Sequence, residues 1–161
     1  MRSVFVVVMM SACTPWTELP DVPGPGQVAA VTPGVYAGEA TLEVRAFAGP
    51  LLVKRELCSV PIDITVDTSA GPLLEGEFTC VFESTGEVSA DFVGDDDGLP
   101  LISGMLEARS LEAMWDGWFI DSTSLYADME GRDNQDGLRI EYLGFVEAER
   151  TGPVPGSSLG G

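Results

Sequence analysis

The stretch that decides the fold runs from residue 73 to residue 83 and reads LLEGEFTCVFE. Its even-numbered positions include the large apolar residues Leu74, Phe78 and Phe82, and its odd-numbered positions include the acids Glu75, Glu77 and Glu83. A period of two places these two sets on opposite sides of a β-strand. The stretch therefore predicts a strand with one buried face and one face in water.

The same alternation extends through most of the chain. Seven further segments show it, at residues 35–47, 60–67, 87–93, 101–109, 111–121, 124–130 and 138–150. No segment shows a sustained helical period. Residues 48–59 are ambiguous, and 51–57 within them are a candidate ninth strand.

The connections between these segments are short and rich in turn-forming residues, as at 68–72, 84–86 and 121–123. Two longer polar tips are expected at 94–98 and 131–137. Short links between consecutive strands favour antiparallel pairing. The sequence thus predicts an all-β fold, an antiparallel meander of about eight strands, and a closed barrel is favoured over a sandwich.

The inward positions repeat a large, small, large order. Examples are Leu74-Gly76-Phe78, Ile102-Gly104-Leu106 and Trp115-Gly117-Phe119. Recurring glycines inside strands indicate bends or close backbone approach, and small barrels mix small and large inward residues to fit their taper. The alternative is an internal cavity for an apolar ligand, as in lipocalin-type barrels. The first and last strands share Tyr-x-Gly, at Tyr36 and Tyr142, which indicates that they lie side by side and close the barrel.

The first thirteen residues read MRSVFVVVMMSAC and have the layout of a secretory signal peptide. Met10-Ser11-Ala12-Cys13 resembles the lipobox of bacterial lipoproteins. The resemblance implies that residues 1–12 are removed, that Cys13 is lipidated, and that the lipid holds the chain on a membrane of the cell envelope. Thr14 follows the cysteine in place of the aspartate that retains such proteins at the inner membrane, which favours the outer membrane.

This resemblance divides the chain into four parts. Residues 1–12 are the signal peptide, and 13–34, rich in proline and glycine, are the lipidated cysteine and a tether. Residues 35–150 form the barrel domain. Residues 151–161 contain little to bury and are expected to be a disordered tail.

With Cys13 assigned to the lipid, Cys58 and Cys80 remain as a pair in an oxidising compartment, so a disulfide between them is predicted. Both cysteines have inward parity, which means that the period of two places them on the inner face of their strands, so the disulfide should be buried. The chain contains no histidine, which excludes a Ser-His-Asp triad and any zinc site with histidine ligands. No catalytic motif is present, no cofactor or metal is predicted, and the protein is not expected to be an enzyme.

The chain carries 26 acidic and 8 basic residues, a net charge of −18. Nucleic acids and anionic lipid headgroups require a basic surface, so this balance argues against both as partners. A charged partner should be cationic. An irregular calcium site on the acidic tip at Asp95–Asp97 remains an open alternative.

Five outward positions carry large apolar residues where other strands place polar ones: Met114, Trp118, Ile120, Leu143 and Phe145. An exposed apolar patch often marks an interface, so these are the candidate contacts for a protein partner. The alternative is that residues 28–31, residues 51–57 or a second sheet cover them.

Residues 35–150 resemble small all-β lipoprotein domains of predatory and soil bacteria. The resemblance lies in four segments, 36–38, 58–67, 75–80 and 142–150, and it implies the fold and the compartment only. The sequence therefore predicts an envelope-anchored lipoprotein that acts as a binding or structural module. The alternative is a carrier of a small apolar ligand inside the barrel.

Overall fold

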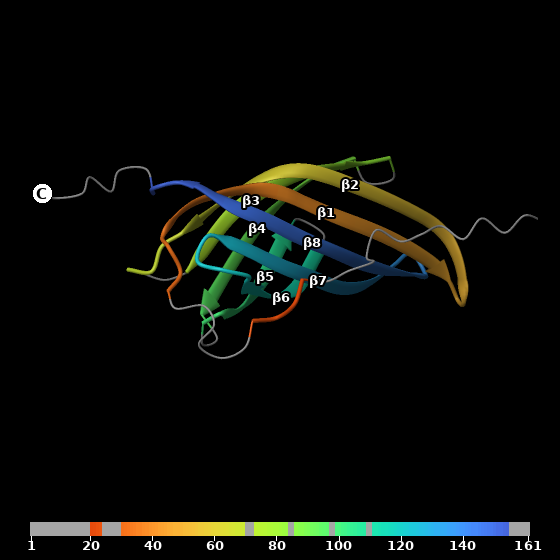
Figure 1. Cartoon of the computed structure of the whole chain (residues 1–161). Helices are drawn as coiled ribbons and strands as arrows, with labels where there is room; N and C mark the ends of the chain where they lie inside the picture. Colours follow the sequence, from red (N-terminus) through yellow and green to blue (C-terminus); the bar gives the residue numbers. More distant parts are fainter. Residues whose placement is uncertain are drawn as a thin grey trace, which may run out of the picture.

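The structure, a computed structural model, describes residues 20–23, 30–69, 73–83, 86–96, 99–108 and 111–154. The predicted signal peptide, Cys13, much of the tether and residues 155–161 lie outside the described residues. Eight strands follow one another: β1 (Gly34–Ala48), β2 (Leu51–Val66), β3 (Leu74–Phe82), β4 (Gly86–Asp96), β5 (Leu101–Ala108), β6 (Leu111–Phe119), β7 (Ser124–Gln135) and β8 (Leu138–Gly152). Each strand pairs antiparallel with the next (Figure 1).

The sheet closes on itself because β8 pairs with β1, from Val35 opposite Gly152 to Phe47 opposite Arg139. The prediction of an all-β meander closed as a barrel is therefore confirmed. The pairing also confirms that the two strands with Tyr-x-Gly are neighbours.

The alternation with a period of two correctly indicates which face of each strand forms the core. Every strand contributes buried residues of inward parity to the core, among them Tyr36, Ile64, Phe92 and Leu125. At mid-barrel the rings of Phe92 and Trp115 stack with their centroids 4.2 Å apart. The interior at this level is therefore filled by aromatic side chains.

The small inward residues make room for these rings. Gly94 on β4 lies opposite Gly104 on β5, and Gly104 lies opposite Trp115 on β6. A Cβ added at Gly104 would come within 2.7 Å of Cζ2 of Trp115, and one added at Gly94 would overlap the same indole. The repeat of large and small residues is thus a packing pattern, in which the Trp115 ring covers two bare stretches of backbone.

The structure settles one ambiguous stretch and corrects one predicted connection. The ambiguous residues 51–57 are not a separate ninth strand but the first half of β2, which follows a two-residue turn at Gly49 and Pro50. The predicted polar tip at 131–137 is mostly strand, because β7 continues to Gln135 and turns at Asp136 and Gly137. These two residues have φ of 51° and 80°, as expected for a two-residue hairpin turn. Main-chain pairing with β8 sustains the strand although its side chains are polar.

Two long hairpins extend the barrel at one end. We call residues 43–57 of β1 and β2 together with residues 130–143 of β7 and β8 the four-strand extension. Their order is β7-β8-β1-β2. In Figure 1 the long ribbons of β1, β2 and β8 reach well beyond β3 to β6. At the opposite end of β1, the N-H of Thr32 and the hydroxyl of Tyr36 donate hydrogen bonds to the carbonyl of Ser122, at 3.0 and 3.2 Å.

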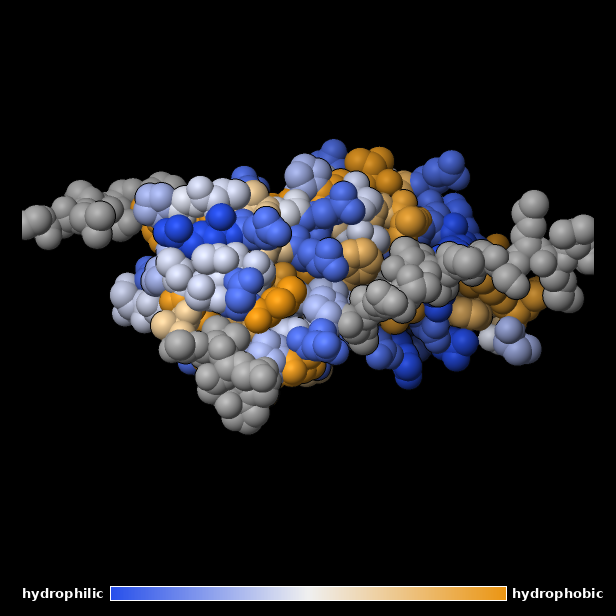
Figure 2. Space-filling model, in the orientation of Figure 1, coloured by the Kyte–Doolittle hydropathy of each residue, from blue (hydrophilic) through white to orange (hydrophobic). Residues whose placement is uncertain are grey.

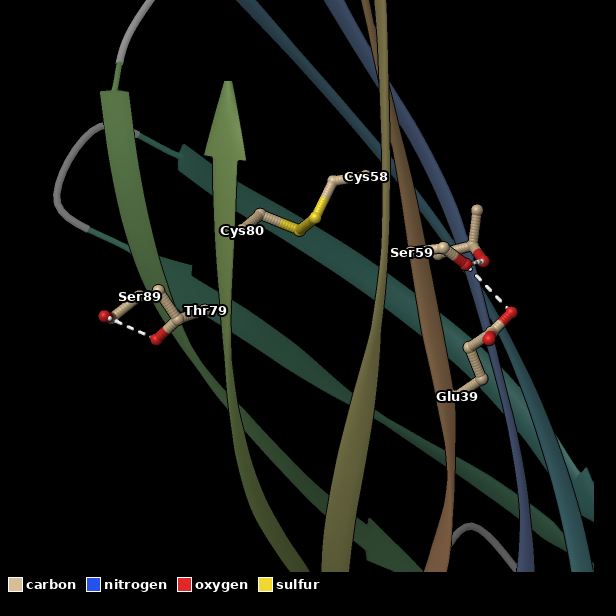
Figure 3. Close-up of a disulfide and its surroundings, with 7 residues drawn as sticks. Glu39, Cys58, Ser59, Thr79, Cys80 and Ser89 are labelled. Atoms are coloured by element: carbon tan, nitrogen blue, oxygen red, sulfur yellow. Dashed lines mark hydrogen bonds between the residues drawn. A yellow bond between two sulfur atoms is a disulfide. The ribbon is translucent and has the colours of Figure 1, made fainter. Parts of the chain in front are cut away.

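The seam between β2 and β3 is the weakest in the barrel. Only residues 63–66 of β2 pair with β3, from Asp63 opposite Glu77 to Val66 opposite Leu74. Pro61, which has no N-H to donate, lies just before this short ladder. Beyond it the Cys58–Cys80 disulfide joins the two strands, with the Cα atoms 5.8 Å apart (Figure 3). Both cysteines are buried, so the predicted disulfide is confirmed. A loop of this size contributes about 3 kcal/mol in the chain-entropy account.

The packing of Trp115 against glycine leads to a prediction. Gly104→Ala should lower the free energy of unfolding by about 2 kcal/mol, because the new methyl group would clash with the main-chain carbonyl of Val93 and overpack the core against the indole. Urea denaturation monitored by tryptophan fluorescence measures the change. Gly152→Ala is the matched control, since an added Cβ there has no atom within 4 Å, and it should change stability by less than about 0.5 kcal/mol. Equal effects of the two substitutions would contradict this packing account.

Candidate functional site

A row of four carboxylates crosses the outer face of the barrel. Asp63 on β2 lies directly opposite Glu77 on β3, Glu77 opposite Asp91 on β4, and Asp91 opposite Glu107 on β5. All four residues are exposed. We call these four residues the acidic row.

The acidic row is electrostatically unfavourable. Adjacent strands are about 4.8 Å apart, so the row spans about 14 Å with a negative charge on each strand. Like charges directly opposite one another destabilise a sheet. Among the ion pairs that the described residues form, none includes a member of the row. Within the described residues, no basic side chain forms an ion pair that offsets this repulsion.

The row lines a groove of about 800 Å³ on the outside of β2 to β5. Glu75 and Asp95 add two further carboxylates to its walls, and the backbones of Gly76, Gly94 and Gly104 also line it. The carboxylates are spread along the groove, and no group of three or more His, Cys, Asp or Glu side chains in the described residues is placed to hold a metal ion. This geometry suits an extended cationic ligand better than a single ion.

The five apolar residues predicted as an interface do not form one exposed surface. Met114 is 69% exposed and Ile120 38%, but Trp118 is only 8% exposed. Leu143 and Phe145 are half-buried. Whether any of them contacts a partner stays a prediction.

An outward aromatic cluster explains part of this burial. The ring of Trp118 packs on Tyr126, with centroids 4.9 Å apart, and Tyr126 stacks on Phe145 at 6.5 Å. Burial raises the pKa of Tyr126 to about 12, with smaller contributions from the charges of Asp128 and Glu147. No pattern in the sequence indicates Tyr126, because its outward neighbours on the same strand are polar.

A buried charge links two strands of the four-strand extension, β1 and β2. Glu43 has outward parity on β1, yet its side chain has no exposed surface. It lies directly opposite Leu57 on one side and Leu143 on the other. Its Oε1 accepts hydrogen bonds from Nε of Arg45 and, at 2.8 Å, from Nε of Arg55, while its Oε2 accepts one from Nη2 of Arg55 at 2.8 Å.

The pKa of Glu43 is set by opposing effects. Burial on its own raises the pKa, but the hydrogen bonds and charges of Arg55 and Arg45 outweigh it, so the pKa lies below the ordinary value of 4.5. Glu43 is thus ionised at neutral pH and links β1 to β2. No feature of the sequence marks it out among 26 acids.

Comparison with protein-family models, curated proteins and solved structures finds no match to this chain. In the described part of the chain no helix is long and apolar enough to cross a membrane. The inference of function therefore depends on the sequence and the geometry alone.

The Glu43 cluster makes a prediction about pH. Glu43→Gln should lower the free energy of unfolding by about 2 kcal/mol at pH 7, since it removes a charged acceptor from two arginines. Because the folded-state pKa is depressed, the contribution of Glu43 is present above its unfolded pKa and is lost as pH falls through the lower folded value. The difference between parent and variant in denaturant unfolding should therefore shrink as pH falls below 4.5. A difference that stayed constant down to pH 2 would contradict this assignment.

Proposed function

We propose that the protein is a lipid-anchored binding module of a bacterial cell envelope. Its ligand is a Lys- or Arg-rich segment of another envelope protein, held in the acidic groove. The lipid on Cys13 holds the module on the membrane, most simply the outer membrane, and the proline- and glycine-rich tether gives it reach.

The acidic row is the observation that carries this proposal. A sheet normally avoids like charges directly opposite one another, and here they occur on four adjacent strands. A cationic ligand across the row would turn repulsion into attraction at each strand. A feature that costs stability in the free protein and is relieved in the complex is typical of a binding site.

The anchoring part of the proposal rests on the lipobox resemblance at Met10-Ser11-Ala12-Cys13. The confirmed pairing of Cys58 with Cys80 supports it indirectly, because that pairing leaves no other cysteine of the chain for Cys13 and is typical of an oxidising compartment.

An apolar carrier has less support. The described inward residues at mid-barrel pack closely, with Trp115 stacked on Phe92 and seated over Gly94 and Gly104. Catalysis is not proposed either, since the carboxylates that line the groove are all exposed.

The groove is tested with the double substitution Glu77→Gln and Asp91→Asn. Titration calorimetry with a hexalysine peptide should show binding to the parent that weakens as salt is added, and binding to the variant that is weaker at every salt concentration. The same variant should be more stable than the parent, by about 0.5–1 kcal/mol for each like-charged pair removed.

The matched control is Glu87→Gln with Glu149→Gln, which removes the same charge from outward positions off the row. It should leave peptide affinity nearly unchanged. If both double variants bind the peptide equally, the attraction comes from net charge and the groove is not a site. Cys13→Ser tests the anchor separately, and should move the protein from the membrane fraction of the producing bacterium to the soluble fraction.

A further inference from the structure

The first half of β2 has an open edge. β2 pairs with β1 along its whole length, from Leu51 opposite Ala48 to Val66 opposite Gly34. On its other side it pairs with β3 only from Asp63 onward, and no other described strand pairs with this edge. The main-chain groups of residues 51–57 that face away from β1 therefore have no strand partner within the described residues.

The open edge is also apolar. Leu51, Leu52, Val53 and Leu57 are 45–65% exposed. Figure 2 shows hydrophobic residues at the surface at the end of the molecule where β1 turns into β2. Proteins normally protect such edges, since an exposed apolar strand is a template for pairing with another chain.

The sequence of this edge is complementary to itself. Residues 53–57 read VKREL. In an antiparallel pair of two such segments centred on Arg55, Lys54 lies opposite Glu56 of the other copy, and Val53 lies opposite Leu57. A two-fold axis through Arg55 makes every one of these contacts twice, as a symmetric interface requires. Lys54 and Glu56 already attract each other within one chain, with Nζ and Oε2 3.4 Å apart.

The two-fold axis also brings the two Arg55 residues face to face. Each guanidinium is bonded to Glu43 of its own chain, at 2.8 Å on two atoms. The charge of each Arg55 is therefore partly offset by a carboxylate of its own chain, which Arg55 shares with Arg45, and the repulsion between the two Arg55 residues is reduced.

The charge distribution favours this surface for contact between copies. Two chains of net charge −18 repel each other over most of their surfaces. Of the basic residues in the described part of the chain, all but Arg150 belong to the four-strand extension: Arg45, Lys54, Arg55, Arg132 and Arg139. The extension is thus where two copies meet with least repulsion.

We propose that two copies of this chain associate through β2, with residues 53–57 paired antiparallel about Arg55. The pairing joins the two extensions into one continuous sheet in the order β7-β8-β1-β2 and then β2-β1-β8-β7 of the second copy. A second copy fits this edge better than an unrelated peptide, because the matching of charges is with the edge itself.

Sedimentation velocity of the full chain in a non-ionic detergent tests the proposal by exchanging charges. Lys54→Glu places two acids opposite two acids, and Glu56→Lys places two lysines opposite two lysines. Each variant alone should dimerise roughly tenfold more weakly or worse than the parent. An equimolar mixture of the two variants should dimerise as well as the parent, since every pair across the axis then has opposite charges.

Arg132→Glu is the control, because it makes the same change in net charge as Lys54→Glu but on β7, away from the open edge. Its dimerisation should match that of the parent. A parent chain that remains monomeric at every concentration overturns the proposal. So does a mixture of the two charge variants that remains as monomeric as either alone, and a chain that had misfolded could not be rescued by mixing.

Discussion

The pairing of β1 with β8 is the constraint on which the rest of the structure depends. Because these strands are the first and last of the meander, their ladder fixes the circumference of the barrel and makes the inward faces of all eight strands enclose one core. The ladder runs almost the whole length of β1. The irregular part of the barrel lies two seams away, between β2 and β3.

The seam between β2 and β3 combines a short ladder with a repulsive pair. The ladder ends where Asp63 lies opposite Glu77, two members of the acidic row. Only residues 63–66 of β2 pair with β3 through the main chain. The repulsion between Asp63 and Glu77 weakens this short ladder further. The Cys58–Cys80 disulfide lies just beyond this point and keeps the strands adjacent. We interpret the disulfide as the covalent bond that allows the row to exist in a stable sheet.

Parity could be read from the sequence, and register could not. The period of two correctly assigned the inward residues, from Leu74 and Phe78 to both cysteines, because burial of one face acts on each strand separately. The acidic row depends on which residues lie opposite one another across strands, and single-strand patterns contain no such information. The ambiguity at 51–57 has a similar cause, since the register shift between Ala46 and Phe47 leaves Val53 without a partner and interrupts the alternation of β2. The burial of Glu43 could not be predicted from the sequence, because it depends on neighbours on two other strands.

The two proposed surfaces are compatible, and their combination has a consequence. The acidic groove uses β2 from Asp63 onward, whereas the open edge uses residues 53–57, so a dimer would leave both grooves accessible. Two grooves on one rigid sheet would bind two cationic segments of a partner, or of neighbouring partners, at a fixed separation. Binding of the second segment would then be intramolecular, and its effective concentration would raise the overall affinity without any new contact. Weak, salt-sensitive contacts at each groove would in this way suffice for a stable attachment at the membrane surface, where the proposed lipid anchors would concentrate both copies.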